Sequence, residues 1–169
     1  MYLYRQQYAH PELKENLRLE RAGKITTFAP ERRTFLREEI GYWRKANHIH
    51  RWFVENVQEG SDDGHDYYVD RSELEELLKL VIKVLKHSKL VPGTVPAGRR
   101  ILQNGEIQDT WEDGSIIDNP ELAETLLPRL GGCFFGSLDY DQDYVNELRH
   151  TKSLNQKIMK DSNIFRSCG

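Results

Sequence analysis

The chain has 169 residues, the length of one globular domain, and such a domain can bury a stable core without disulfides. Acidic residues outnumber basic ones by 27 to 24, the net charge is -3, and the two signs are interspersed along the chain. A general nucleic-acid binder would usually show a basic stripe, so this class is disfavoured. The two cysteines, Cys133 and Cys168, are too few for a disulfide framework and lack the Cys-x-x-Cys spacing of zinc or redox sites.

The N-terminal residues show no basic segment followed by an apolar run, and every apolar stretch is far shorter than a membrane span. The small number of cysteines fits a reducing compartment. We therefore expect a cytoplasmic protein that does not enter a membrane.

The first third of the chain predicts two short strands and one long helix. Aromatic residues alternate with other side chains over residues 2–8, which indicates a strand with one buried face, and residues 24–28 form a second β-prone run. Pro30 then suits the first turn of a helix, where its missing N–H is not needed. We expect a single amphipathic helix over residues 31–57, and we expect it to organise the domain.

On a helical wheel centred on Ala46, the apolar side chains of this helix gather in one core-facing stripe. Glu39, Asn47 and His50 fall inside the stripe or at its edge, whereas His48 points away and is expected to be solvated. Polar groups that are buried need hydrogen-bond partners or a ligand. Glu39, Asn47 and His50 are therefore the positions where a site is most worth seeking.

Residues 58–66 are rich in Gly, Asp and Ser and predict an exposed loop, and residues 67–69 suit a short strand. Asp70 and Glu73 have the spacing of a capping box at the start of a second helix. Leucine and valine recur at helical spacing from there to about His87. We expect this second long helix to pack on the first.

Residues 91–118 have the pattern of an inserted arm, with several Pro and Gly residues before a β-prone run. Asn104-Gly105 is a strong signal for a type I′ turn, because both central positions of that turn have positive φ. We predict a hairpin over residues 100–111 that projects from the core. Its exposed edge can pair with a second copy of the chain, which would give a homo-oligomer.

Three further elements are predicted after the arm: a short helix from Asn119-Pro120 to Leu127, a buried strand over residues 131–137, and a last amphipathic helix over residues 141–160. Residues 161–169 are expected to form a flexible tail. We predict an α+β fold in which residues 1–160 make one domain. In this domain two long packed helices and a C-terminal helix lie against a small sheet, and the hairpin of residues 91–118 is inserted.

The patterns that suggest a metal site fail on inspection. His48 and His50 lie two residues apart, so on a helix their side chains point about 200° apart and cannot share one ion. Residues 139–143 open like a calcium-binding loop, but the sixth position is Tyr144 instead of Gly. The acids of residues 62–66 are typical of an ordinary exposed loop. We expect neither a metal nor another cofactor.

Familiar catalytic signatures do not occur in the sequence. The chain has no Gly-x-Ser-x-Gly elbow, no P-loop and no dinucleotide-binding glycine pattern. Cys133 stands in an expected core strand, where a thiol acts as an inert small apolar group rather than a nucleophile. Catalysis is therefore the less favoured interpretation, and we assign no catalytic residues.

The densest cluster of chemically useful side chains lies in residues 42–53. It combines aromatic rings that stack, cations that neutralise an anion, and Asn and His side chains that read a polar edge, which a nucleotide-like ligand requires. The competing interpretation is a core helix with a solvated basic side, and Trp52 is the residue that it explains worst. The candidate ligand-binding residues, with two from the segment before the last helix, are Trp43, Arg44, Asn47, His50, Trp52, Phe135 and Tyr140.

At these residues the sequence resembles a family of tailed-phage and prophage proteins that has no assigned activity. The shared motifs are a Met-Tyr-Leu start (residues 1–3), a Tyr-Trp-Arg-Lys-Ala-Asn-x-Ile-His-x-Trp-Phe-Val string (42–54), Tyr-Tyr-Val (67–69), Phe-Phe-Gly-Ser (134–137) and Asp-x-Asp-x-x-Tyr (139–144). The chain departs from the family in the insertion of residues 91–118, in Gly64, where relatives often have Cys, and in Arg129-Leu130, which replaces a more polar pair. The resemblance implies a phage origin and no particular chemistry.

The leading hypothesis is a non-enzymatic phage accessory protein in the host cytoplasm. It would bind a small anionic, nucleotide-like ligand or a host protein, by analogy with phage proteins that counter host defence. One alternative is a hydrolase or phosphodiesterase with His50 as general base and Glu39 or Asp139 assisting. The other alternative is a purely protein-binding module.

Overall fold

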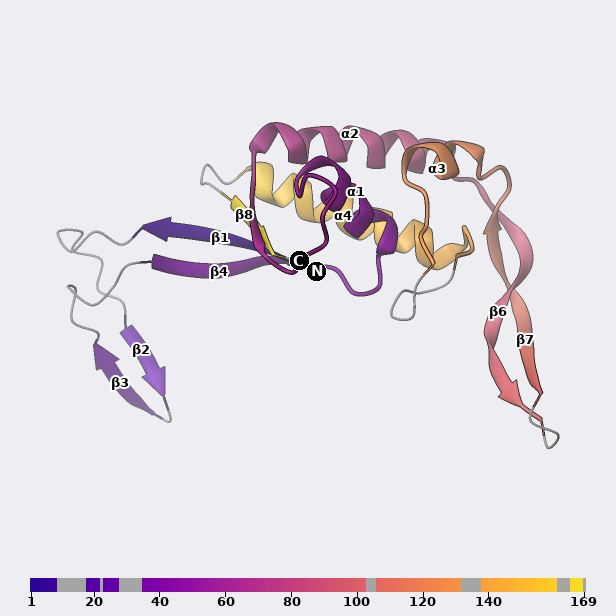
Figure 1. Ribbon diagram of the computed structural model, residues 1–169, viewed down its shortest axis with the longest axis horizontal. Helices are drawn as coiled ribbons and strands as arrows, with labels where there is room; N and C mark the ends of the chain where they lie inside the picture. Colours follow the sequence, from indigo (N-terminus) through magenta and orange to yellow (C-terminus); the bar gives the residue numbers. More distant parts are fainter. Residues whose placement is uncertain are drawn as a thin grey trace.

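A computed structural model describes residues 1–8, 18–21, 23–27, 35–102, 106–131, 138–160 and 165–168. In these residues the chain forms an α+β fold, in which four helices accompany a four-stranded antiparallel sheet of order β4-β1-β8-β5 and two separate two-stranded ribbons (Figure 1). The predicted fold class is confirmed. Within the same residues, no helix is both long and apolar enough to cross a lipid bilayer.

The sheet is built around β1 (Tyr2–Tyr8), which pairs with β4 (Phe35–Tyr42) on one side and with β8 (Phe165–Cys168) on the other. β5 (Asp66–Val69) pairs with the outer side of β8. The strands predicted over residues 2–8 and 67–69 are confirmed. The flexible tail predicted for residues 161–169 is wrong for residues 165–168, because they form the strand between β1 and β5.

The single helix predicted over residues 31–57 is also wrong. Residues 35–42 form the strand β4, and a shorter helix, α1 (Asn47–Asn56), begins only after the turn of residues 43–46. Gly41 pairs with Leu3, and a Cβ atom at Gly41 would lie 2.7 Å from Leu154 Cδ2, so a glycine lets the strand approach the C-terminal helix closely. Glu39, which the helical wheel placed near the core, is exposed on this strand.

The three later helices begin where they were predicted to begin, and side chains at each start accept hydrogen bonds from backbone N–H groups. In the capping box of α2 (Arg71–His87), the Glu73 carboxylate accepts a 2.6 Å hydrogen bond from the Asp70 N–H. The Asn119 Oδ1 atom accepts from the Glu121 N–H at the start of α3 (Glu121–Leu126). Asp141 caps α4 (Gln142–Met159) by accepting a 3.0 Å hydrogen bond from the Tyr144 N–H.

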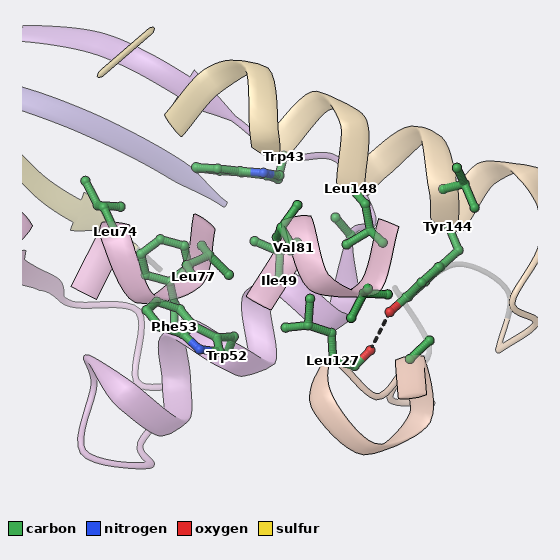
Figure 2. Close-up of a cluster of buried hydrophobic side chains, with 14 of the residues drawn as sticks. Trp43, Ile49, Trp52, Phe53, Leu74, Leu77, Val81, Leu127, Tyr144 and Leu148 are labelled. Carbon is green, nitrogen blue, oxygen red and sulfur yellow. Dashed lines mark hydrogen bonds between the residues drawn. The ribbon is translucent and has the colours of Figure 1, made fainter. Parts of the chain in front are cut away.

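The hydrophobic core lies among α1, α2 and α4 (Figure 2). α2 runs alongside α4 (Figure 1), and it also shares the buried core with α1, the helix on which it was predicted to pack. α2 and α4 each supply four of the buried apolar residues and α1 supplies three, while the others come from β1, β5, α3, Ile117 and the segments beside them. The fully buried apolar and aromatic side chains include Leu3, Ile49, Phe53, Leu74, Leu77, Val81, Tyr144 and Leu148.

β6 (Leu90–Ile101) and β7 (Ile107–Ile117) form a long antiparallel ribbon, called the arm below, that projects from one end of the helices (Figure 1). The predicted hairpin is confirmed and is longer than residues 100–111. Its predicted turn lies at residues 103–105, outside the described residues. The base of the arm belongs to the core, because Ile117 is buried and its N–H donates to the Tyr140 C=O at 2.8 Å.

A second ribbon consists of β2 (Arg18–Arg21) and β3 (Lys24–Thr27). It confirms the β-prone run predicted from residue 24, although β2 lies in a stretch whose polarity gave no strand signal. The buried strand predicted over residues 131–137, which includes Cys133, falls outside the described residues except for Gly131.

Candidate functional site

The start of α1 combines two exposed cations with a helix N-terminus that has no capping side chain. Arg44 and Lys45 are exposed, and Lys45 has a φ of 62°, a left-handed conformation that is uncommon for residues other than glycine. The N-cap residue is Ala46, which cannot cap the helix, and the first turn contains no acidic residue. The positive end of the helix dipole therefore follows directly on two positive side chains.

An exposed pair of aromatic rings precedes this helix start. Tyr42 is 42% exposed, and its ring centroid lies 4.8 Å from that of Tyr2, which is 38% exposed. Consecutive residues of a chain cover at most about 3.6 Å each, so the Cα atoms of Tyr42 and Arg44 lie within about 7 Å. The Tyr42 C=O accepts a 3.0 Å hydrogen bond from His150 Nε2, which ties the end of β4 to α4.

Trp43 and Trp52, predicted to stack on a ligand, both lie in the core. Trp43 is 3% exposed, and its Nε1–H donates to Thr151 Oγ1 on α4 at 2.9 Å. Trp52 is 6% exposed and packs edge-on against Phe53, with 5.2 Å between ring centroids. The two rings stabilise the junction of α1 with the rest of the fold and present little surface to a ligand.

His50 is half-buried on the next turn of α1, and its Nε2 atom lies 2.9 Å from the Asp62 Oδ2 atom in the loop after the helix. The acid that His50 contacts is therefore Asp62 rather than the Glu39 or Asp139 of the hydrolase hypothesis, and Glu39 is exposed on β4. A histidine oriented by a carboxylate can act as a general base. In this structure the pair also joins the loop of residues 58–66 to the helix.

Beneath the start of α1 lies a buried group of charged and polar side chains that we call the polar cluster: His48, Arg129, Asp141 and Glu147. The Arg129 Nη2 atom is 3.4 Å from Glu147 Oε2 and 3.7 Å from Asp141 Oδ1. The His48 Nδ1 atom is 3.4 Å from the same Glu147 oxygen. The side chains of His48 and Arg129 are 0% and 2% exposed, so the cluster is closed to solvent on this side.

The environment of the polar cluster changes two pKa values in opposite directions. Burial, helped by the nearby Arg129 cation, lowers the pKa of His48 from 6.5 to about 3. Burial raises the pKa of Glu147 from 4.5 to about 7, although Arg129 opposes the rise. At neutral pH the cluster thus holds a neutral imidazole beside a carboxyl group that is close to its own pKa.

Two predicted residues meet at the segment next to the polar cluster. Asn47 is 1% exposed, its Nδ2–H donates to the Leu130 C=O at 2.6 Å, and its Oδ1 atom has no hydrogen-bond partner. The Tyr140 hydroxyl accepts a 3.1 Å hydrogen bond from the Arg129 N–H. The structure thus brings Asn47 and Tyr140 to the backbone of two adjacent residues, Leu130 and Arg129. Phe135, also predicted here, lies outside the described residues.

The acidic loop after α1 distributes its charges over separate pairs. Asp63 accepts hydrogen bonds from the His65 N–H and the Tyr67 hydroxyl, and these bonds lower the pKa of Asp63 to about 2. Asp66 pairs with Arg37 of β4 at 2.9 Å. Among the described residues, no group of three or more His, Cys, Asp or Glu side chains could hold a metal ion.

A second cationic surface lies between the C-terminal end of α2 and α4. A shallow pocket of about 290 Å³ is lined there by Arg149 and Lys152 together with Leu85, Ser88, Val145, Ser153 and Gln156. It offers two positive charges and several hydrogen-bonding groups to a ligand. It is the rival location for an anion and is treated as such in the experiments below.

Sequence reasoning missed three members of the polar cluster. His48 was expected in solvent because the helical wheel assumed a helix continuous from residue 31, whereas the chain turns at residues 43–46 and rotates His48 inward. Glu147 could have been found, since it lies three residues after Tyr144 and one before Leu148 on the buried side of α4. Arg129 follows a proline in an irregular segment and has no periodic signal.

Comparison with known proteins gives no match, since no family model, no curated protein and no solved structure shows significant similarity to this chain.

Proposed function

We propose that this protein is a non-enzymatic binding protein for a small anionic, nucleotide-like ligand, and that the ligand binds at the start of α1. The observation that carries the proposal is the uncapped helix N-terminus directly after the exposed Arg44 and Lys45. The same proposal places the protein among phage accessory proteins that act on the host from its cytoplasm, because residues 42–54 carry the resemblance to the phage family.

Electrostatics favour an anion at this helix end. A capping Ser, Thr, Asp or Asn would normally accept hydrogen bonds from the first N–H groups. Ala46 has no such side chain, and the Asn47 and Ile49 N–H groups donate to the C=O groups of Lys45 and Ala46 instead. An anion at a helix N-terminus gains about 0.3–1 kcal/mol from the dipole alone, and the two cations add to this attraction. Lys45 keeps its left-handed backbone at a cost of about 1–2 kcal/mol, which is typical of residues held in place for a function.

The neighbouring side chains support a nucleotide-like ligand over a bare anion. The exposed rings of Tyr2 and Tyr42 offer a stacking surface within reach of a phosphate held at Arg44. Asn47, at the first turn of α1, has a buried Oδ1 atom without a hydrogen-bond partner among the described residues. Buried polar atoms of this kind call for a partner, which water or a ligand can provide.

Isothermal titration calorimetry with inorganic pyrophosphate and with ATP tests this proposal. The full chain should bind both, and the double variant Arg44→Ala/Lys45→Ala should lose at least tenfold in affinity for both. Tyr42→Ala should weaken ATP binding and leave pyrophosphate binding unchanged, because only the base needs the rings. Lys79→Ala/Lys83→Ala removes the same charge from the exposed side of α2 and should have little effect.

Two results would refute the proposed site. The first is that neither probe binds the full chain. The second is that Arg149→Ala/Lys152→Ala abolishes binding while Arg44→Ala/Lys45→Ala does not, which would move the site to the pocket between α2 and α4.

Incubation with a nucleotide panel followed by chromatography tests the hydrolase alternative. Turnover that disappears in His50→Ala would favour an enzyme that uses the His50 and Asp62 pair.

A further inference from the structure

Beyond its base, the arm presents strand edges that no other strand of the described residues covers. β6 and β7 pair with each other, and the outer edge of β7 meets another segment at its base, where Ile116 bridges to Asp141 and the Ile117 N–H donates to the Tyr140 C=O. The arm also projects away from the helices (Figure 1), which leaves both edges accessible. Unpaired edges bind further strands readily, and natural proteins usually block them.

The two edges differ because of the prolines in β6. Pro92 and Pro96 have no N–H, so a proline is accommodated only where its nitrogen faces outward from the pair. Opposite residues of an antiparallel pair turn their N–H and C=O groups the same way, both inward or both outward. Pro92 lies opposite Ser115 and Pro96 opposite Trp111, so Trp111, Asp113 and Ser115 direct their N–H and C=O groups to the outer edge of β7.

The outer edge of β6 is therefore poor in donors, whereas the outer edge of β7 retains them. β7 contains no proline. Its side chains add two further features. Ile107 and Trp111 are 65% and 60% exposed and lie on one face of the ribbon, since they are four residues apart on the strand. Asp109, Glu112 and Asp113 are exposed, and β7 has no lysine or arginine.

A second copy of the chain does not fit this edge. Two β7 strands paired with each other would bring their acidic residues together, which is destabilising. β7 of one copy paired with β6 of another would meet the edge at which Pro92 and Pro96 lack donors. Acidic charge, exposed apolar side chains and free backbone groups together favour a strand of opposite charge.

We propose that the outer edge of β7 binds an extended, basic segment of another protein as an added antiparallel or parallel strand. Backbone hydrogen bonds to Trp111, Asp113 and Ser115 would supply the binding. Lysine or arginine side chains on one face of the partner strand would lie beside Glu112, which points to the face opposite Ile107, Trp111 and Asp113. Apolar residues on the other face of the partner strand would cover Ile107 and Trp111. This interface is independent of the ligand site proposed at α1.

Fluorescence anisotropy with the full chain provides the test. The probe is a fluorescein-labelled peptide with the eleven residues of β7's length, in which lysine or arginine alternates with valine or threonine. An otherwise identical peptide with glutamate in place of the basic residues is the control. The basic peptide should bind, the acidic one should not, and binding should weaken with added salt because the charges are exposed.

Two pairs of variants distinguish the contribution of backbone hydrogen bonds to peptide binding from the contribution of charge. Asp113→Pro removes an N–H from the outer edge of β7, whereas Thr94→Pro removes the matching N–H from the edge of β6, because Thr94 lies opposite Asp113. Glu112→Lys/Asp113→Lys reverses the charge of β7, and Glu76→Lys/Glu124→Lys makes the same change on exposed helix positions. The β7 variants should each bind the basic peptide at least tenfold more weakly, and the two controls should bind it as the natural chain does.

Several outcomes would overturn the proposal. Absence of binding by the basic peptide would mean that the acids of β7 only protect its edge. If Asp113→Pro and Thr94→Pro lose binding equally, the loss comes from a damaged hairpin. The charge-reversal variants then test the interface, because full binding of the basic peptide by Glu112→Lys/Asp113→Lys would refute it. Analytical ultracentrifugation gives the last outcome. If the natural chain is a dimer, Asp113→Pro is a monomer and the basic peptide does not bind, the edge of β7 binds a second copy of the chain and not another protein.

Discussion

The polar cluster and the arm depart from the usual distribution of side chains in opposite ways. In the polar cluster, Arg129 and Asp141 are buried and Glu147 is half-buried between α4 and the segment after α3, so ionisable groups are withdrawn from water. In the arm, Ile101, Ile107 and Trp111 are large apolar groups exposed to water at 78%, 65% and 60%. Buried charges and exposed apolar groups are the informative exceptions in a folded protein, because each has an energetic cost that packing alone does not require.

These unusual side chains affect the free energy of folding differently in the two regions. Charges taken out of water lose hydration, and only close partners of opposite sign restore part of it, so every member of the polar cluster depends on the others. Exposed apolar side chains on the arm lose nothing relative to the unfolded chain and contribute little to folding. The comparison predicts that stability is sensitive to single changes in the polar cluster and insensitive to changes in the arm.

The largest effect is expected for Arg129→Met. Removal of the cation would leave the Asp141 and Glu147 carboxyl groups buried without their positive neighbour, and breaking a buried ion pair in this way costs about 3–5 kcal/mol. The free energy of unfolding in urea measures the loss. Arg51→Met is the control, because Arg51 and Glu55 form a solvent-accessible pair four residues apart on α1, and its loss should cost less than about 1 kcal/mol.

The double variant Arg129→Met/Glu147→Gln sharpens this test. It removes the carboxyl group that the single variant leaves uncompensated, so it should recover part of the lost stability. If the double variant is as unstable as Arg129→Met, the loss comes from altered packing against Tyr144, whose ring lies 5.2 Å from the guanidinium carbon, and the charge argument is wrong.

A smaller effect is expected in the dependence of stability on pH. The pKa of His48 falls from 6.5 to about 3 on folding, so its contribution to stability is complete above pH 6.5 and is lost as the pH falls toward 3. The pKa of Glu147 rises from 4.5 to about 7, so its contribution is complete below pH 4.5 and is lost as the pH rises toward 7. Between pH 4.5 and 6.5 the two slopes oppose each other and largely cancel.

Single variants should uncover each slope. In Glu147→Gln only the His48 slope remains, so stability should rise between pH 4.5 and 6.5, by up to about 2–3 kcal/mol. In His48→Gln only the Glu147 slope remains, and stability should fall over the same range. Urea unfolding across this range measures both profiles. Two variants with the same profile as the natural chain would show that neither group titrates differently in the folded state.

The parts of the fold that the sequence predicted are those with local signals. α2 and α4 follow from apolar spacing, helped in α2 by the capping box of Asp70 and Glu73, and the arm follows from its β-prone runs and the Asn-Gly pair. β4 was missed because its partner β1 lies some thirty residues earlier, and a run that fits helical spacing by chance gives no sign of a distant strand. β8 was missed because a four-residue strand at the chain end is stabilised only by the strands beside it.

Only part of the candidate site was predicted, because the sequence carries local signals and gives no sign of contacts between distant residues. Arg44, Asn47 and Tyr140, which the sequence offered as ligand-binding candidates, lie at the start of α1 or at the segment that contacts it. Trp43 and Trp52 went to the core because α1 begins at residue 47 and turns both rings inward. His48 and Glu147 come together from positions almost a hundred residues apart, and only tertiary packing creates that contact.

The smallest effect is expected when most of the arm is removed. Joining Pro92 to Ser115 through a two-residue Asn-Gly turn keeps the paired base and the buried Ile117, which deletion of all residues 91–118 would lose. The free energy of unfolding should change by less than about 0.5 kcal/mol, because the removed side chains are mostly exposed and a shorter connection costs less entropy to close. Hydrogen exchange of α1 and α4 should keep its protection. A loss above about 2 kcal/mol, or lost protection in α4, would show that the outer arm supports the core and that the two regions are coupled after all.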